Sequence, residues 1–191
     1  MRRVALSIVV FATILVFATS RAATPRADDF EVQISPHIGY GLVRLSDKYV
    51  DPSAQDTRDL YEAGLSLGVA TPIGLVIESG FRRGSAYSAV VDGREFALSN
   101  VTLAVGYQFE NSRGFRLVPK VGRNYWRLND IDRDVFNTTI APRDQEGYDY
   151  FWELGLMKRV RRSSALGLTV GNVGFEFGHV ATVNFTATFG F

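Results

Sequence analysis

The two histidines of this sequence, His37 and His179, are candidates for a catalytic base. A histidine can serve as a general base only when a nucleophile or an orienting acid lies within hydrogen-bond reach. His179 is followed by no serine over the next several residues, and His37 stands alone on the polar side of an alternating segment. The sequence around neither histidine indicates a catalytic pair, so we expect a protein that is not an enzyme.

Three aspartates, Asp130, Asp132 and Asp134, have the spacing with which a calcium-binding loop begins. The match stops there, because Val135 stands where the turn-forming glycine is needed and Ala141 where the bidentate glutamate is needed. The chain has no cysteine, so it can form neither a disulfide nor a thiolate metal site. We therefore expect no metal and no cofactor.

Acidic and basic side chains that alternate with apolar ones are the remaining candidates. An ionised side chain that faces lipid at mid-depth costs ~2 to 4 kcal/mol, so in a membrane-spanning sheet such residues should share an interior. Eight charged residues fall on the inward positions of alternating segments: Glu31, Glu62, Glu78, Arg82, Glu110, Arg116, Lys120 and Glu153. We expect an interior polar network of ion pairs among five of them: Glu62, Glu78, Arg82, Lys120 and Glu153.

Eight segments with a period of two must position these side chains, and this period is that of a strand with one apolar and one polar face. In the second segment, Tyr61, Ala63, Leu65, Leu67 and Val69 oppose a polar and glycine-rich parity. The segments span approximately residues 30–46, 60–71, 75–83, 95–110, 115–128, 148–160, 165–174 and 179–191.

The connections between these segments alternate in length. Tight turns are expected at 71–74, 111–114 and 161–164, whereas 47–59, 84–94 and 129–147 are long and polar and 175–178 is short. Barrels of the outer membrane place short turns in the periplasm and long loops outside. The sequence thus predicts an all-β fold, an eight-stranded antiparallel up-and-down transmembrane β-barrel with both termini in the periplasm.

Aromatic residues provide an independent test of this topology. A water-soluble barrel of lipocalin type would also alternate, but its apolar face would lie inside and its aromatic residues would have no reason to form bands. Here the outward aromatic residues fall into two girdles, as expected at the two membrane interfaces. The periplasmic girdle would hold Tyr107, Phe109, Phe115, Phe189 and Phe191, and the outer girdle Tyr61, Phe81, Tyr148 and Tyr150.

Arg123 and two prolines do not fit the simple pattern. Arg123 shares the parity of lipid-facing residues, so either it reaches the outer interface by snorkelling, or a bulge at Gly122 turns it inward and Trp126 outward. The sequence leaves both alternatives open. Pro36 and Pro119 each remove one hydrogen bond from a sheet that has no free edges.

The amino-terminal residues 1–22 have the basic head, apolar run and small residues of a secretory signal peptide, with the expected cut after Ala22. The apolar run is shorter than the ~20 residues of a membrane-spanning helix. Residues 23–191 would then form one barrel domain. Without residues 1–22, which hold three arginines and no acidic residue, the formal net charge changes from +1 to −2, which argues against a nucleic-acid partner.

The eight segments, and the last of them in particular, resemble the small outer-membrane β-barrel family that includes the OmpA transmembrane domain, OmpX and Ail, and the neisserial opacity proteins. The resemblance covers nearly all of residues 23–191 and implies a bacterial outer membrane as the location. In this family the last strand is read by the barrel-assembly machinery. The matching positions here are Val183, Phe185, Phe189 and Phe191, with Ala187 as a small substitute.

Our first hypothesis is a structural or surface-interaction role, resembling adhesion or resistance proteins, through the long extracellular loops. We expect a monomer whose partners are outer-membrane lipid and lipopolysaccharide. Eight strands enclose only enough space for their own side chains, so a narrow gated pore is an alternative. A second alternative is an enzyme that modifies lipid A, since some barrels of this family do so with a histidine near the outer leaflet.

Overall fold

The computed structural model of the protein describes residues 30–46, 57–86, 96–129 and 145–191. The expected signal peptide, the three aspartates near residue 130 and most of each long connection lie outside the described residues. The strands are β1 Glu31–Leu45, β2 Thr57–Ala70, β3 Leu75–Ala86, β4 Phe96–Tyr107, β5 Phe109–Glu110, β6 Phe115–Asn129, β7 Gln145–Arg161, β8 Ser164–Phe175 and β9 Gly178–Gly190. Across these ranges we find no helix with the length and apolar character needed to cross a membrane.

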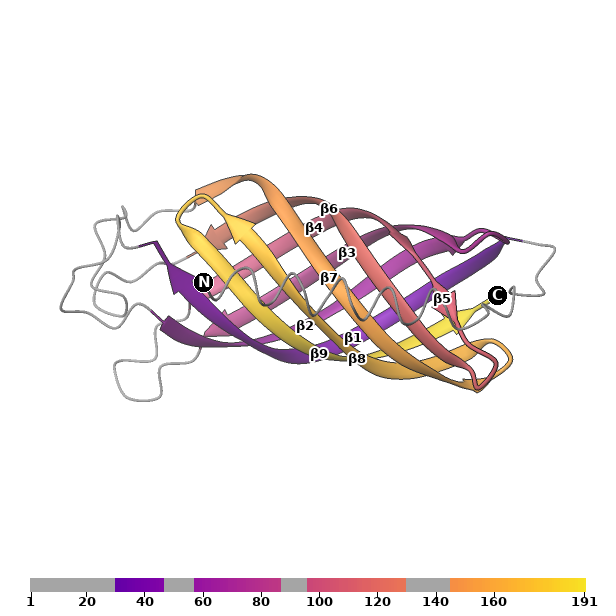
Figure 1. The fold of residues 1–191 in the computed structure, drawn as a ribbon. Coiled ribbons are helices and arrows are strands. Elements are labelled where there is room, and N and C mark those ends of the chain that lie inside the picture. The colour runs from indigo at the N-terminus through magenta and orange to yellow at the C-terminus, as the bar shows by residue number, and fades with distance from the viewer. Residues whose placement is uncertain (1–29, 47–56, 87–95, 130–144) are drawn as a thin grey trace, which may run out of the picture.

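These strands form one closed sheet in which each strand runs antiparallel to its neighbours (Figure 1). β1 pairs with β2 on one side and with β9 on the other, and β4 pairs with β6. β5 continues β4 after a break at Gln108, since both pair with β6. The strand count is therefore eight, and the predicted fold class is confirmed.

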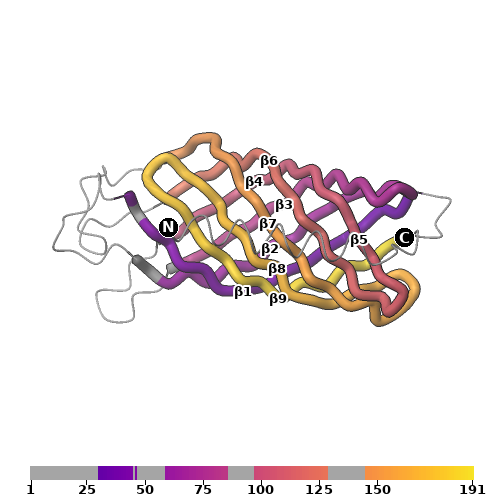
Figure 2. Tube along the Cα trace, viewed as in Figure 1, coloured from indigo at the N-terminus to yellow at the C-terminus, as the bar shows by residue number. Residues whose placement is uncertain are grey.

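The two ends of the barrel differ, as the chain trace shows (Figure 2). At one end, which we call the turn end, lie the three tight turns at 71–74, 111–114 and 162–163 together with Phe191. Gly74 and Gly114 adopt φ angles of +90° and +75°, which favour glycine. At the other end, which we call the loop end, β1, β3 and β6 enter their long connections and a short hairpin joins β8 to β9.

Three strands extend further toward the loop end than the alternation predicts. β2 begins at Thr57 instead of residue 60, β3 ends at Ala86 instead of 83, and β7 begins at Gln145 instead of 148. The added residues include polar side chains on both parities, such as Asp59 and Glu146 on the outward one. Backbone pairing continues there because hydrogen bonds between strands need no apolar face. The strands therefore extend beyond the residues that alternate between apolar and polar side chains.

The two prolines coincide with gaps in the ladders. The β1–β9 register runs to Ile34 opposite Phe189 and resumes at His37, so that the pairs of Ser35 and Pro36 with β9 are missing. The β4–β6 register stops next to Pro119, and the backbone N–H of Gln108 donates instead to the carbonyl of Gly74 at 2.7 Å. Each missing N–H is thus accommodated by a local break in one ladder, while the other ladder of the same strand continues.

Side chains alternate inward and outward along every strand. Arg123 faces outward with its guanidinium 4.4 Å from the ring centre of Tyr150, and Trp126 faces inward and is 1% exposed. The register of β6 with both neighbours runs through Gly122 without a shift. The bulge alternative is therefore wrong, and the outward alternative for Arg123 holds.

Candidate functional site

Charged side chains from three strands meet inside the barrel. Lys120 of β6 lies between two carboxylates, with its Nζ 2.9 Å from Oε1 of Glu78 on β3 and 2.8 Å from Oε1 of Glu153 on β7. The second oxygen of Glu153 pairs with the guanidinium of Arg82, which also belongs to β3. Arg82 and Glu153 are 3% and 4% exposed. We call these four residues the ion cluster, and it joins the walls of the barrel across the lumen.

Small residues on β4 make room for the ion cluster, because β4 lies between β3 and β6. In the register of the sheet, Ala104 is opposite Glu78 and Gly106 is opposite Lys120. A Cβ atom on Gly106 would lie 2.6 Å from Cγ of Lys120. Glycine at this position therefore lets the lysine side chain pass across β4 toward Glu78.

The fifth residue of the predicted network, Glu62, is buried on β2 beside the ion cluster but takes part in none of these ion pairs. It lies two residues from Gly64, the partner of Arg82 in the ladder, and interacts with the Arg82 charge through space. His37 of β1 lies over Gly64. Nε2 of this histidine has no hydrogen-bond partner among the described residues. The histidine thus faces the barrel interior and not the lipid side.

Apolar side chains fill the lumen at the loop end. The ring of Trp126 packs edge-on against Phe175 and Phe177, with 6.0 Å between ring centres in each pair. Both phenylalanines belong to the β8–β9 hairpin region, where the backbone N–H of Ser46 donates to the carbonyl of Phe177 at 2.6 Å. We call the following buried residues the apolar seal: Val43, Leu60, Leu98, Trp126, Leu128, Phe175, Phe177 and Val180.

The apolar seal was missed by the sequence analysis, although a signal for it exists. Val43, Leu60, Leu98 and Leu128 stand on the inward parity close to the loop ends of their strands. Each is an apolar residue on an otherwise polar and glycine-rich face. A single exception of this kind on one strand does not predict a buried apolar layer. In the closed sheet Leu98 lies opposite Leu128 and Val43 opposite Val180, so that interruptions from separate strands become neighbours.

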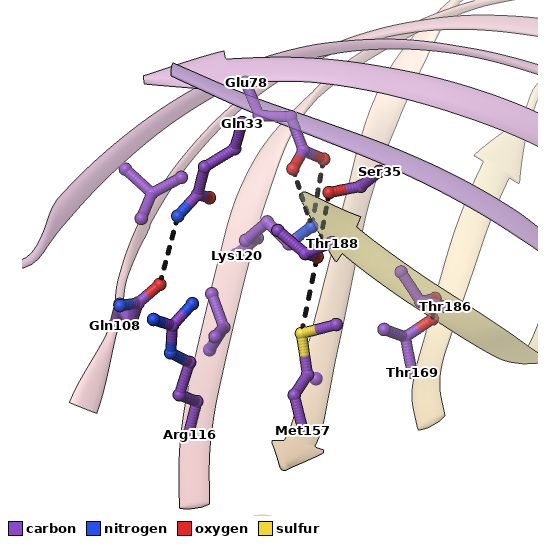
Figure 3. Close-up of a pocket in the computed structure, with 13 residues that line it drawn as sticks. Gln33, Ser35, Glu78, Gln108, Arg116, Lys120, Met157, Thr169, Thr186 and Thr188 are labelled. Carbon is purple, nitrogen blue, oxygen red and sulfur yellow. Dashed lines mark hydrogen bonds and ion pairs between the residues drawn. The ribbon is translucent and has the colours of Figure 1, made fainter. Parts of the chain in front are cut away.

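Toward the turn end, the lumen keeps a small cavity of about 20 Å³ (Figure 3). Its walls combine apolar and charged side chains with amides and hydroxyls. Gln33 donates to Gln108 at 3.5 Å, and the hydroxyls of Ser35 and Thr188 are 2.9 Å apart. A cavity of this size holds about one water molecule. It therefore has no room for an organic ligand.

The outside of the barrel is apolar between two bands of aromatic side chains. At the loop end Tyr40 and Tyr61 are in contact at 5.7 Å between ring centres, and Tyr125 and Tyr148 at 5.1 Å. Between the bands, exposed aliphatic residues face outward: Leu65, Leu67, Ile77, Val101, Leu103, Val105, Val121, Leu156, Leu168 and Val170. The turn-end band includes Tyr107, Phe109, Phe115, Phe189 and Phe191.

The four residues of the predicted assembly signal lie on the outside of β9 and directly after it. Val183, Phe185 and Phe189 are exposed on the outward parity, and Phe191 is 78% exposed. The backbone of Phe191 exchanges hydrogen bonds with Val32 of β1, at 2.9 Å and 3.2 Å. The aromatic side chain of Phe191 is thus free for contact while its backbone closes the ladder.

Comparison with known proteins finds no protein-family model that matches the chain and no similar curated protein. Solved structures do match. Neisserial surface protein A (NspA) is 13% identical, with 85% of this chain and 97% of that chain covered and a TM-score of 0.58. Ail, the attachment invasion locus protein of Yersinia pestis, is 12% identical, with 84% and 99% covered and a TM-score of 0.56. The N-terminal β-barrel domain of Pseudomonas aeruginosa OprF is 16% identical, with 85% and 100% covered and a TM-score of 0.51. The chain therefore has the fold of the small eight-stranded outer-membrane β-barrels.

Proposed function

We propose that this protein is an outer-membrane barrel that acts through its cell-surface loops. An apolar exterior bounded by aromatic bands suits a lipid bilayer, because amphipathic rings are most stable at its interfaces. In this proposal the turn end faces the periplasm with both termini, and the loop end faces the outside. The barrel itself is the anchor and the folded support of the loops.

The filled lumen is the observation that carries this proposal. The ion cluster crosses the lumen, and the apolar seal blocks it again at the loop end. Between and below these layers, the cavity among the described residues holds about one water molecule. A lumen filled in this way does not favour a pore, so in this proposal the long connections are the place for function.

The charge of the loops narrows the class of partner. Residues 47–56, 87–95 and 130–144 together contain nine acidic and four basic side chains, a formal charge of −5. The Ail structure in complex with a heparin analogue shows that protein with a polyanion. Acidic loops would repel such a ligand, so for this chain we propose a basic protein surface, or lipopolysaccharide bridged by divalent cations.

Replacement of one loop tests the proposal. Because β6 continues to Asn129 and β7 begins at Gln145, only residues 131–143 should be exchanged for a short glycine-serine linker. We expect the variant to lose attachment to host cells or survival in serum. A matched exchange of residues 88–94 provides the control, and the heat-dependent gel shift of folded barrels checks folding for both. Full attachment and survival with folded variants would contradict a role for this loop.

The pore and enzyme alternatives correspond to distinct results. Reproducible conductance steps of the purified wild-type protein in a planar bilayer would contradict the closed lumen. A changed lipid A mass on overexpression would contradict a non-enzymatic role. The structure removes one candidate base for the second outcome, because His37 lies inside the barrel, where an outer-leaflet lipid cannot reach it.

A further inference from the structure

Four cations gather at one corner of the turn end. Arg113 lies in the β5–β6 turn, Lys158 near the end of β7, and Arg161 and Arg162 at the β7–β8 turn. The two turns are held together, because the backbone N–H of Arg159 donates to the carbonyl of Gly114 at 2.8 Å. The Lys158 ammonium also donates to the carbonyl of Arg113. The turns lie side by side in the chain trace (Figure 2). We call Arg113, Lys158, Arg161 and Arg162 the basic corner.

No acidic side chain in the described part of the chain forms an ion pair with the basic corner. The nearby carboxylate of Glu110 is taken by two other cations, Arg116 at 2.9 Å and Arg159 at 2.6 Å. Within the described ranges, none of the four residues of the basic corner forms an ion pair. The excess positive charge is therefore available to an anion from outside the chain.

The basic corner is confined to one side of the turn end. The third turn, between β2 and β3, carries no charged residue and exposes Ile73. A general attraction between a barrel and its membrane would not require such an asymmetry. The charge distribution instead marks one sector of the circumference, formed by β6, β7 and β8.

Lys158 places this sector at the edge of the lipid-facing surface. It stands on the outward parity of β7, and its partners in the ladder are Phe115 on one side and Leu166 on the other. Both partners are exposed on the apolar exterior, and Nζ of Lys158 lies 4.4 Å from the ring centre of Phe115. An ammonium flanked by apolar groups that face lipid lies where lipid phosphates lie, because a long side chain keeps its charge at the interface.

We infer that the basic corner binds the phosphates of anionic phospholipids in the leaflet at the turn end. This inference rests on the proposed function, which makes the protein a membrane barrel. Each lysine or arginine near a membrane surface contributes about 1 kcal/mol of attraction to anionic lipid, equivalent to about fivefold in binding. The lipid is recognised by its net negative charge at one sector of the barrel, so it should accumulate there and not around the whole circumference.

Single cysteines can report the lipid composition at each sector, because the chain has none of its own. Val160→Cys places a fluorophore on the outward face beside the basic corner, and Ile77→Cys places one on the outward face near the uncharged turn. Each barrel is inserted into phosphatidylcholine vesicles that contain either spin-labelled phosphatidylglycerol or spin-labelled phosphatidylcholine. The measured quantity is the ratio of quenching by the two labelled lipids.

We expect phosphatidylglycerol to quench the probe at residue 160 at least about five times more than phosphatidylcholine does, and the two lipids to quench the probe at residue 77 equally. The double variant Arg161→Gln/Arg162→Gln should lower the ratio at residue 160 toward one, as should high salt. Lys158 is left unchanged because it also joins the two turns. Arg83→Gln/Arg123→Gln, at outward arginines further toward the loop end, is the matched control and should leave the ratio unchanged.

The remaining outcomes separate the inference from the proposed function. If neither lipid quenches either probe, the barrel is not in the bilayer and the proposed function fails. Quenching at both probes with a ratio of one contradicts the basic-corner inference alone. A ratio of one together with salt-sensitive binding of a soluble acidic peptide would assign the corner to a periplasmic protein and overturn the lipid inference. A fall of the quenching ratio at residue 160 to one on addition of inorganic phosphate would show that the basic corner binds phosphate without requiring the lipid.

Discussion

Glu153 is the side chain on which the interior charges depend most. Its two carboxylate oxygens engage different cations, Lys120 and Arg82, on different strands. Among the described residues, Glu78 forms an ion pair with Lys120 alone. A buried cation that loses its single carboxylate is left uncompensated, whereas a cation that keeps a second one is not.

We predict that Glu153→Gln lowers the free energy of unfolding by about 3 to 5 kcal/mol, because it leaves Arg82 without its partner. Urea unfolding in lipid vesicles, followed by tryptophan fluorescence, measures the change. Glu78→Gln is the matched control and should cost clearly less, since Lys120 keeps Glu153. Equal losses for the two variants would contradict this division of roles.

At the scale of the strands, β9 combines two separable properties, one in its backbone and one in its side chains. The backbone closes the ring against β1, and Phe191 takes part in that closure through its main-chain atoms. The outward side chains, which include Phe185 and Phe189, contact nothing that the ladder needs. We therefore propose that recognition during assembly rests on the side chains of β9, whereas stability after assembly rests on its backbone.

We predict that Phe191→Ala lowers the yield of folded barrel in cells while it leaves the urea midpoint of folded molecules nearly unchanged. The alanine keeps both backbone hydrogen bonds with Val32, so the stability lost is limited to the exposed ring. The heat-dependent gel shift measures the yield. Leu168→Ala, an outward residue on β8, is the control and should leave the yield intact. A large fall in the urea midpoint with normal yield would reverse this assignment.

The sequence predicts the strands well where one face meets lipid and the other meets the interior, as in the run from Tyr61 to Val69. It predicts them poorly near Thr57 and Gln145, where pairing continues without that contrast. It also indicates which charges point inward. It cannot indicate that Glu153 forms ion pairs with two cations while Glu62 forms none with a described residue, because such pairings depend on the distance across the closed barrel.

At the scale of the whole molecule, the lumen is closed by two barriers of different kinds in series. The ion cluster is polar and would accept water if its charges were separated. The apolar seal excludes water with the rings of Trp126 and its neighbours. Apart from the indole N–H of Trp126, which has no hydrogen-bond partner among the described residues, its side chains offer water no hydrogen bond. Opening one barrier therefore leaves the other in place.

We predict that Glu153→Gln alone produces no conductance steps in a planar bilayer. Adding Trp126→Ala and Phe177→Ala removes the rings that fill the loop end and should produce steps. Trp126→Ala/Phe177→Ala with Glu153 intact is the control and should remain silent, since the ion cluster is unchanged. Steps from Glu153→Gln alone would show that the apolar seal does not block the lumen.

The pairing of β1 with β9 also has a consequence for the order of events during synthesis. The first and last strands of the ring are neighbours, so every intermediate that lacks β9 has two open edges with unpaired backbone groups. Open edges recruit other strands, which in a crowded compartment means aggregation. A chain with this topology cannot protect itself strand by strand as it is made. We therefore expect it to need a chaperone until residues 178–190 are available, because only then can the edges of β1 and β9 pair with one another.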